Sequence, residues 1–527
     1  MAPISLGMAR PATSPIPRAL ASVIVAATTA VVALQPAAAR ADVTFRFYGS
    51  GYGHTVGMSQ YGAYGMARAG HTATQILKHF YRGTSVGRIS SPPSLVRVGL
   101  VQGATSISLK APNGSVSVRL RSHTGTVLAR IPSGSTWSVV ARSGAFWIRR
   151  SNGSYVGGKG YGGSSTPLVA TFGSGGVYLP GTGHTYAHGW IEFNVYRACS
   201  SCSSRLRAIN TLGIQSYLYG LAEVPSLWPG AALRAQAIAG RTYAYYKIRT
   251  SGQHRPTCNC AVYAGVSDQS YVGVDKVRST GGSRWADAVD STSGLAVVKD
   301  GLAIFAPYSS ASGGHTENVE NVWGGTAVSY LRGVCDPWDY AVDPNRTWTV
   351  SMSGASIGNA LRSATGKNIG EARSFQSVQR GVSGAIVRAT VAGTNGSVTV
   401  SGSTLRFALH LRSAHVWINQ NRNIVGQVRA KYDALSCAPG LPQSRLVEVS
   451  GGRYQAFRIG RIYVNDAAGR AYWIYGLVLT KYRSLGASGG RLGLPTSDVF
   501  KVDSVRVRAR FQHGTITCNK STGNCTT

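Results

Sequence analysis

The pattern of hydrophobic and polar positions predicts an α+β fold that is rich in strands. Residues from about 95 to 192 contain many short apolar runs of strand length, separated by turn sequences such as Asn113-Gly114. A further short strand is predicted at residues 43–48. Apolar residues then recur with helical spacing, which predicts an amphipathic helix that ends near Gly83.

The main helical region is predicted at residues 212–249. Abundant Gly (66 residues), with frequent Ser, Thr and Val, favours strands and turns over long helices elsewhere. The remaining predictions are a helix within residues 268–298, a strand pair around Gly301, a helix at residues 357–364 and a hairpin at residues 393–399.

The chain of 527 residues is long enough for two or three domains. Residues 1–41 are predicted to be a secretory signal, cleaved after Ala41. An uncleaved anchor is the alternative, but the apolar run at residues 19–34 is short for a membrane span. We expect an exported protein with no anchor after cleavage. Its predicted parts are a large domain at residues 42–420, with a strand-rich subdomain at about 95–192, a linker at residues 421–445 and a small β-rich module at residues 446–527.

Positive charge is spread along the whole chain. Lys and Arg number 54 against 19 Asp and Glu, which gives a formal net charge of +35. Such a field favours anionic partners. For an exported protein, the anionic polymers of a cell wall fit better than nucleic acid. The basic residues do not run together, so they indicate a broad field and not a localised binding arm. The alternative is that the charge only aids solubility.

Eight cysteines, an even number, predict disulfide bonds in an exported protein. Cys518 and Cys525 form the easiest pair to propose, because they would close a short loop. The alternative elsewhere is a zinc ion held by four thiolates. Those thiolates would come from Cys199, Cys202, Cys258 and Cys260. The spacing of the second pair is tighter than in usual zinc knuckles, so disulfides are the preferred interpretation.

A single acid, Glu223, lies in an apolar and aromatic segment of this acid-poor chain. The segment at residues 217–241 reads YLYGLAEVPSLWPGAALRAQAIAGR. A glutamate packed against apolar groups has a raised pKa and can hold the proton that an acid catalyst donates. The alternative is a helix-capping glutamate, or one paired with Arg234 or Arg241.

A glycine-rich string, GYGHTVGMSQYGAYG, begins at Gly51. Its glycines allow a tight loop with positive φ, from which polar side chains would project. Hydrogen-bonding groups of this kind suit a hydroxyl-rich ligand. The residues predicted to bind such a ligand are His54, Ser59, Gln60 and Tyr61. The alternative is a structural turn whose histidine caps the following helix.

Four segments of the chain together resemble the SpoIID/LytB family. The glycine-rich string resembles the family's histidine-glycine pattern, with Thr55 in place of one Gly. Glu223 keeps the family spacing to a Val-Pro and a Trp-Pro pair. The other two matches are YSSASGGHT at residues 308–316 and a segment at residues 380–413. Together the four matches span about residues 42–420.

The chain departs from the family pattern in three ways. The histidine-glycine segment usually closes the family's domain, whereas here it opens the domain, as a circular permutation would arrange it. The approach to Glu223 is shorter than usual. Some members bind zinc through Cys and His beside a C-x-V-Y string, but here the string that begins at Cys260 lacks the neighbouring His.

Residues 446–527 resemble LGFP repeats, which are modules of actinobacterial wall-associated enzymes and are taken to anchor them to the wall. The strings that carry this resemblance are AFRIGRIYV, YGLVLTKYRSLG and RLGLPTSD, with Leu494 in place of the family's Phe. The alternative is a small β-rich domain with no ligand.

The family resemblance implies a lytic transglycosylase that cleaves peptidoglycan glycan strands. Ordinary glycoside hydrolysis uses two carboxylates, and no second acid lies close to Glu223 in sequence. Protonated Glu223 would donate to the glycosidic oxygen and then accept the proton of the sugar's own 6-hydroxyl, which leaves a 1,6-anhydro end. The competing hypothesis is a non-catalytic wall-binding protein that enhances an amidase.

Further residues are predicted to bind the substrate, although packing roles are the alternative for each. Gln236 and Tyr243 share a helical face because they are seven residues apart, whereas Arg241 points elsewhere. A Ser-His nucleophile pair is conceivable in the third matching segment, but no partner acid is identifiable, so ligand binding is preferred. The residues of that segment are Ser310, Ser312 and His315. No cofactor is predicted.

Overall fold

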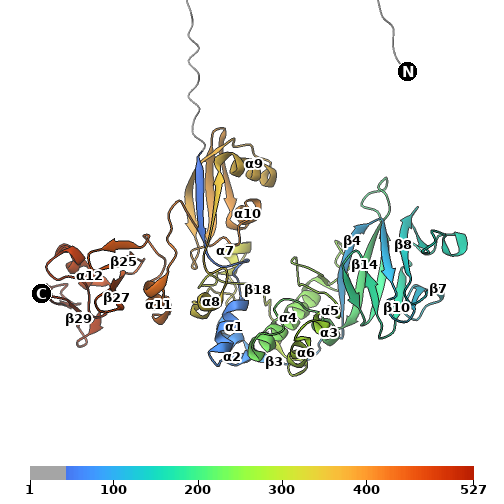
Figure 1. Ribbon diagram of the computed structural model, residues 1–527, viewed down its shortest axis with the longest axis horizontal. Coiled ribbons are helices and arrows are strands. Elements are labelled where there is room, and N and C mark those ends of the chain that lie inside the picture. Colours follow the sequence, from blue (N-terminus) through green and yellow to red (C-terminus); the bar gives the residue numbers. More distant parts are fainter. Residues whose placement is uncertain (1–42) are drawn as a thin grey trace, which may run out of the picture. The chain divides into compact units, whose positions relative to one another are not determined.

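The computed structural model describes residues 43–527 (Figure 1). The predicted signal at residues 1–41 lies outside the described residues. From residue 43 onward, helices are mixed with several separate sheets, which confirms the predicted α+β class. No helix in this described range is long and apolar enough to span a membrane.

The first strand joins the predicted large domain near its far end. Strand β1 (Thr44–Gly49) pairs antiparallel with β19 (Trp348–Ser353) on one side and with β23 (Val416–Ile418) on the other. The beginning of the domain therefore lies beside its end, which is the adjacency that a permuted order requires.

Two helices follow β1, of which the second is the predicted amphipathic helix. Helix α2 (Ala73–Phe80) buries Ile76, Leu77 and Phe80 on one face. Its first turn is closed by a capping box, in which Thr72 and Gln75 satisfy each other's free backbone N–H groups. The predicted helix is thus confirmed.

Helix α1 (Gln60–Arg68) differs from the loop that the sequence suggested. Gln60 and Tyr61 begin this helix instead of projecting from a turn. Because glycine has a low helix propensity, the glycines of this segment favoured a loop over a helix in the sequence analysis. Gly65 is needed because a Cβ atom there would clash with the carbonyl oxygen of Trp338, where α1 packs against α8 (Pro337–Val342).

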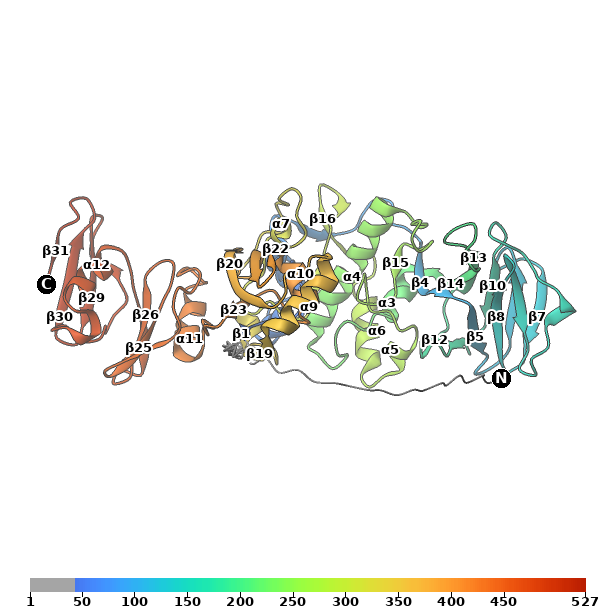
Figure 2. The same ribbon diagram turned by 90° about the horizontal axis from the view of Figure 1, so that it is seen from above.

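The strands predicted at residues 95–192 are confirmed, and together with β14 (Arg205–Gly213) and β15 (Val262–Tyr263) they form two sheets that share one hydrophobic core (Figure 2). The larger sheet contains, in order, β15, β4 (Leu95–Ala104), β14, β13 (Trp190–Tyr196), β10 (Leu168–Phe172), β6 (Val116–Leu120) and β7 (Val127–Ile131). The smaller contains β12 (His184–Tyr186), β11 (Val177–Leu179), β5 (Ser106–Lys110), β8 (Thr136–Arg142) and β9 (Ala145–Arg149).

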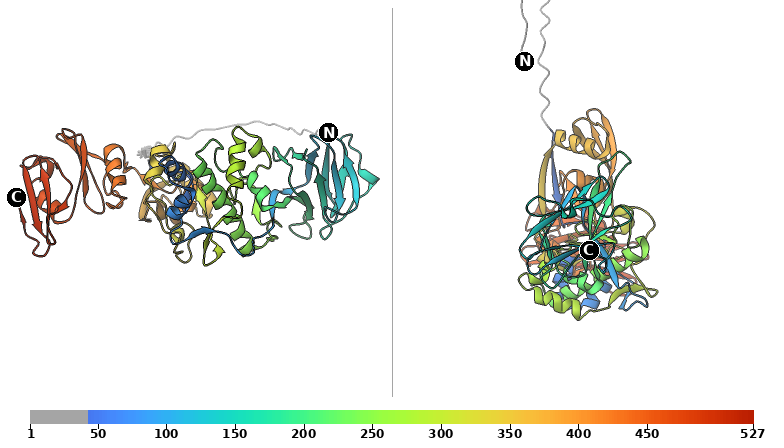
Figure 3. Two further views of the ribbon diagram at one scale, coloured as in Figure 1. Left: turned by 90° about the horizontal axis from the view of Figure 1, so that it is seen from below. Right: turned by 90° about the vertical axis from the view of Figure 1, so that its right-hand side faces the viewer.

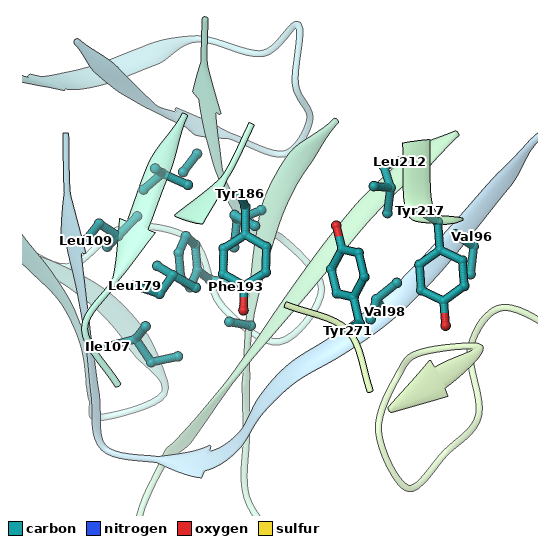
Figure 4. Close-up of a cluster of buried hydrophobic side chains, with 14 of the residues drawn as sticks. Val96, Val98, Ile107, Leu109, Leu179, Tyr186, Phe193, Leu212, Tyr217 and Tyr271 are labelled. Carbon is teal, nitrogen blue, oxygen red and sulfur yellow. The ribbon is translucent and has the colours of Figure 1, made fainter. Parts of the chain in front are cut away.

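The same core continues into the helical region through three tyrosines. Figure 4 shows Tyr186, Tyr271 and Tyr217 side by side along it. The ring centroids of Tyr217 and Tyr271 lie 5.1 Å apart, and those of Tyr186 and Tyr271 lie 5.9 Å apart. The strand-rich part therefore supports the helices that follow it.

Helices form where residues 212–249 predicted them, with one interruption. Helix α3 (Ile214–Tyr219) leads into an irregular stretch at residues 220–229, and α4 (Gly230–Ser251) begins directly after Pro229. Glu223 therefore lies in a loop between two helices. The later predicted helix corresponds to α5 (Asp275–Arg278) and α6 (Gly282–Asp290).

The remaining predicted elements of the large domain are confirmed. A strand pair surrounds Gly301, and Gly393 and Gly396 face each other in the predicted hairpin. The elements of this part are β2 (Met58–Ser59), β3 (Ser85–Gly87), β16 (Ala296–Lys299), β17 (Leu302–Ala303), β18 (Tyr308–Ser309), α7 (Val319–Trp323), α9 (Gly354–Thr365), β20 (Ala372–Arg380), β21 (Ile386–Gly393), β22 (Gly396–Ser401) and α10 (Gly402–Ala408).

The predicted linker at residues 421–445 is folded. It contains helix α11 (Gly426–Ala434), whose Val428 and Tyr432 are buried against Phe457 of the following module. The strands beyond it form two four-stranded sheets, drawn in red in Figure 3. They are β24 (Val447–Val449), β25 (Gly452–Ala456), β26 (Arg461–Asn465), β27 (Arg470–Ile474), β28 (Phe500–Lys501), β29 (Arg506–Phe511), β30 (Gly514–Asn519) and β31 (Cys525–Thr526), with helix α12 (Gly476–Ser484).

Every cysteine of the chain is in a disulfide bond. The predicted pair Cys518–Cys525 is confirmed. Two further bonds are local, Cys199–Cys202 and Cys258–Cys260, and they leave none of these four thiolates free to hold zinc. Within residues 43–527 no group of three or more His, Cys, Asp or Glu side chains could hold a metal ion. The fourth bond joins Cys335 to Cys437.

The Cys335–Cys437 bond ties the end of α11 to the large domain and closes a loop of 102 residues. We expect the double variant Cys335→Ala, Cys437→Ala to lose about 3 to 5 kcal/mol of unfolding free energy, because the unfolded chain regains the entropy of that loop. Guanidinium unfolding measures the loss. The matched pair Cys199→Ala, Cys202→Ala should lose less, because its loop is short. Equal losses would contradict the prediction.

Candidate functional site

Glu223 lies in a cleft of about 810 Å³. The cleft is built from parts far apart in the chain: the loop after β1, the loop before α4, β18, α7 and α10. Its lining includes Tyr52, His54, Gln60, Glu223, Tyr243, Asp268, Ser270, Phe305, Tyr308, Ser310, Glu317, Trp323, Arg406 and Phe407. The predicted acid is therefore at a surface that a ligand can reach.

The loop that carries Glu223 is held at both ends. Before it, the Ala222 N–H donates to the carbonyl oxygen of Ser270 at 2.8 Å. After it, the indole of Trp228 packs against the rings of Tyr61 and Tyr64, with centroids 5.2 and 5.0 Å apart. The Trp-Pro pair of the motif thus anchors the loop on α1.

The Glu223 carboxyl has two hydrogen-bond donors and one nearby cation. Its Oε1 accepts from the Ser270 N–H at 2.7 Å and from the Tyr308 hydroxyl at 3.1 Å. Burial raises the pKa of Glu223, while these donors and the charge of Lys276 oppose the rise. The net effect is a raised pKa, so the Glu223 carboxyl holds its proton to higher pH than an ordinary glutamate.

A second layer of hydrogen bonds fixes Tyr308. The buried Gln269 side chain accepts from the Tyr217 hydroxyl at 2.9 Å. Its amide donates to the Tyr308 oxygen at 2.8 Å and to the Gly240 carbonyl in α4 at 3.2 Å. Because the Tyr308 oxygen accepts from Gln269, its own proton is directed to Glu223.

Asp268, a second carboxylate in the lining, is fully engaged in ion pairs and hydrogen bonds. It lies 3.0 Å from Lys247 and 2.7 Å from Arg255, and it accepts from the Tyr243 hydroxyl at 2.8 Å. Burial alone would raise the pKa of Asp268, but these donors and the Tyr263 N–H lower it. Asp268 therefore stays ionised and orients Tyr243.

Glu317, the third carboxylate in the lining, is also saturated. Its Oε2 accepts from the N–H and hydroxyl of Ser383, and its Oε1 accepts from Asn321 and from the N–H groups of Asn318 and Val382. A carboxylate with this many donors is a structural acceptor. Burial thus raises the pKa of Glu223, whereas the donors around Asp268 lower the pKa of that carboxyl.

His54 lies in the cleft as a neutral base. Its ring packs against Trp323, with centroids 4.8 Å apart. Burial and then the charge of Arg406 lower the pKa of His54 to about 4. Its Nδ1 accepts from the Val56 N–H at 3.0 Å, so the proton of the neutral ring is on Nε2. A hydrogen bond to the Tyr308 backbone partly opposes the fall in the His54 pKa.

Other predicted residues divide between the cleft and the interior. Gln60, Tyr243 and Ser310 line the cleft with Glu223. Gln60 donates to the Glu223 carbonyl oxygen and to the Gln236 amide oxygen, both at 3.3 Å. Gln236 itself is buried beneath Gln60 and outside the lining, so its role is to position Gln60.

The predicted ligand roles of Ser59 and Ser312 are replaced by a buried structural network. The Ser59 hydroxyl donates to Asp339 at 3.0 Å and caps α1. The Ser312 hydroxyl bridges the two acids, with its oxygen 2.9 Å from Asp336 and 3.1 Å from Asp339. Burial and the neighbouring carboxylate raise the pKa of Asp336.

Three more predicted ligands lie away from the lining. Arg241 is buried and donates to the carbonyl oxygens of Thr292 and Leu295 at 2.8 and 3.0 Å. Burial lowers the pKa of Arg241 to about 10. His315 bonds the Thr316 carbonyl at 2.7 Å, and Tyr61 packs on Trp228. Within residues 43–527 no hydrogen bond joins His315 to Ser310 or Ser312, so the structure gives no support to a Ser-His nucleophile pair in the third segment.

The sequence interpretation missed two groups that touch Glu223. Tyr308 opens the segment YSSASGGHT and could have been found there, because that segment was already singled out. Ser270 contributes only its backbone N–H, for which no side-chain signal exists. The roles of Phe305, Trp323 and Arg406 in the lining were also missed, although Arg406 lies within the fourth matching segment at residues 380–413.

Two family models match the chain. The model described as Stage II sporulation protein, SpoIID, matches residues 202–298, which include Glu223 and α4. The model of the LGFP repeat matches residues 440–490. The chain is a SpoIID-domain protein that also carries an LGFP repeat. His54, Tyr308 and Arg406 lie outside both matched ranges.

Curated relatives agree with this assignment. The chain is 28% identical over 243 residues to the stage II sporulation protein D of Bacillus subtilis, covering 42% of this chain and 64% of that protein. It is 34% identical over 131 residues to the amidase enhancer of Bacillus subtilis, covering 25% of this chain and 16% of that protein. An uncharacterised protein of Brachyspira hyodysenteriae is 36% identical over 159 residues, covering 29% of this chain and 39% of that protein. The chain thus spans less than two thirds of each of these relatives.

The contacts of Glu223 predict how its proton affinity responds to substitution. Tyr308→Phe removes a donor that favours the ionised carboxylate, so we expect the pKa of Glu223 to rise further. Carbon-13 NMR titration of the labelled carboxyl measures the change. Tyr330→Phe is the control, because the Tyr330 hydroxyl bonds the Phe305 N–H and not Glu223. A fall in the Glu223 pKa in Tyr308→Phe would refute this account of the site.

Proposed function

We propose that this protein is an exported lytic transglycosylase that cleaves peptidoglycan glycan strands. The observation that carries the proposal is a single protonatable acid, Glu223, in a cleft whose two other carboxylates are saturated with donors. The SpoIID match and the relatives named for sporulation protein D and amidase enhancer support a role in cell-wall remodelling.

One acid suffices when the substrate supplies the nucleophile. Protonated Glu223 donates its proton to the glycosidic oxygen as the bond from the anomeric carbon to that oxygen breaks. The 6-hydroxyl of the same sugar attacks the anomeric carbon and gives its proton to the Glu223 carboxylate. A 1,6-anhydro-muramyl end forms, no water is consumed, and Glu223 ends protonated. A two-carboxylate hydrolase would need a second free acid in the cleft.

The lining of the cleft suits a sugar chain. Neighbouring aromatic rings run from Tyr243 to Phe305 and Trp323, with successive centroids 6.0 and 5.7 Å apart. Their faces can pack against the apolar faces of sugar rings, while Gln60 and His54 offer polar groups to the hydroxyls. Anionic wall polymers and the LGFP repeat would hold the basic protein at the wall.

The second candidate function is enhancement of a wall amidase without catalysis. It is favoured by the 34% identity to the amidase enhancer of Bacillus subtilis. In this reading the cleft binds glycan and presents it to a separate hydrolase. The raised pKa of Glu223 has no part in such a role, which is why catalysis is the first candidate.

Product analysis separates the two candidates. We expect the purified protein to convert glycan strands to fragments with 1,6-anhydro ends, and Glu223→Gln to lose at least about 100-fold in rate, because the amide cannot supply the proton. Mass spectrometry distinguishes anhydro ends from water-adduct ends. Glu320→Gln is the matched control, since Glu320 pairs with Arg332 and does not line the cleft.

Three results would speak against the transglycosylase. Water-adduct ends would indicate a hydrolase, and full activity of Glu223→Gln would remove the acid from the mechanism. Glycan binding without turnover, together with faster release of peptides by an added amidase, would establish the enhancer instead.

A further inference from the structure

Arg406 is the only Lys or Arg among the residues that line the cleft in the described part of the chain. It lies on α10, and its Nε donates to the carbonyl oxygen of Arg412 at 3.1 Å. Its guanidinium lies 4.9 Å from the ring centre of Phe407, which is 68% exposed. These contacts fix the base of the guanidinium. Its two terminal nitrogens donate no hydrogen bond to any residue from 43 to 527.

No carboxylate within residues 43–527 forms an ion pair with Arg406. The other lining carboxylates cannot do so, because Asp268 and Glu317 are occupied by their own donors. Burial lowers the pKa of Arg406, and its charge helps to lower that of His54. A half-buried cation without a counter-ion costs free energy that an anionic ligand group would recover.

We propose that Arg406 is a specificity-determining residue that binds a carboxylate of the glycan substrate. A guanidinium held at Nε still presents its two terminal nitrogens, which match the two oxygens of a carboxylate. A neutral sugar chain would leave this cation unpaired in the cleft. The proposal rests on the glycan-cleaving function above and adds to it a chemical requirement on the substrate.

Two sources could supply the carboxylate. One is the lactyl ether of a muramyl sugar that carries no peptide. The other is a free carboxylate of a peptide attached to that sugar. In either case the acidic group recurs on every second sugar, so binding it at Arg406 sets which glycosidic oxygen reaches Glu223.

Binding measurements on the Glu223→Gln protein separate recognition from turnover. The probes are four tetrasaccharides of alternating N-acetylglucosamine and muramyl sugars. The first has free lactyl carboxylates, and the second has them reduced to alcohols. The third carries a peptide with a free terminal carboxylate on each lactyl group, and the fourth carries the same peptide amidated. Calorimetry gives the dissociation constant of each.

We expect at least one carboxylated probe to bind about tenfold more tightly than its neutral partner, because the ion pair is charge-assisted and partly buried. Arg406→Gln should abolish that ratio, and Arg406→Lys should restore part of it. Preference within the first pair of probes identifies the lactyl carboxylate as the ligand. Preference within the second pair identifies the peptide carboxylate.

Arg412→Gln is the matched control. It removes the same charge from an exposed neighbour that does not line the cleft, and it leaves the Arg412 carbonyl in place for Arg406. The ratio should persist in this variant. Thermal unfolding of each variant confirms that the fold is retained.

The outcomes separate this proposal from the function on which it rests. A ratio that survives Arg406→Gln, or no preference for either carboxylated probe, overturns the role of Arg406 while glycan binding stands. Failure of all four probes to bind overturns the glycan function and the Arg406 proposal together.

Discussion

The hydrogen-bonded chain from Gln269 through Tyr308 to Glu223 is the interaction on which the site depends. Gln269 is buried and joins three parts of the fold: Tyr217 at the end of the strand-rich core, Gly240 in α4, and Tyr308 in β18. Its amide has a single arrangement that satisfies all three partners. That arrangement directs the Tyr308 proton to Glu223. Residues that do not touch Glu223, namely Tyr217 and Gly240, therefore help to fix the hydrogen bond that its carboxyl accepts.

The charge pattern of the cleft follows from this constraint. Burial raises the pKa of Glu223, and the hydrogen bonds from Ser270 and Tyr308 and the charge of Lys276 only partly oppose the rise. Asp268 is placed equally close to the cleft, yet Lys247 and Arg255 keep it ionised. The same physical effect, burial, therefore gives opposite outcomes for two carboxyls, because the number of donors and counter-ions around each decides which form is favoured. Arg406 is the one basic group left unpaired in this lining.

The cleft exists because distant segments of the chain close on one another. Strand β1 lies between β19 and β23, which brings His54 and Gln60 to the same surface as Arg406. The Cys335–Cys437 bond fixes α11 and the following module to the large domain close to the loop that carries Gly314. Covalent and strand-pairing constraints thus hold together residues that the linear order separates by several hundred positions.

The sequence by itself determined the α+β class, the strand-rich region and the amphipathic helix α2, and it singled out Glu223 as the candidate acid, because these depend on local periodicity or on short motifs with fixed spacing. It could not reveal α1, since Gly62 and Gly65 look like loop residues until α8 packs against them. Tertiary structure alone decided that Ser59, Ser312 and Arg241 are buried, that His315 lies outside the cleft, and that Ser270, Tyr308 and Arg406 reach the cleft. The physical reason is that a side chain's role depends on which distant groups satisfy its hydrogen bonds and charge, and only the folded chain brings those groups together.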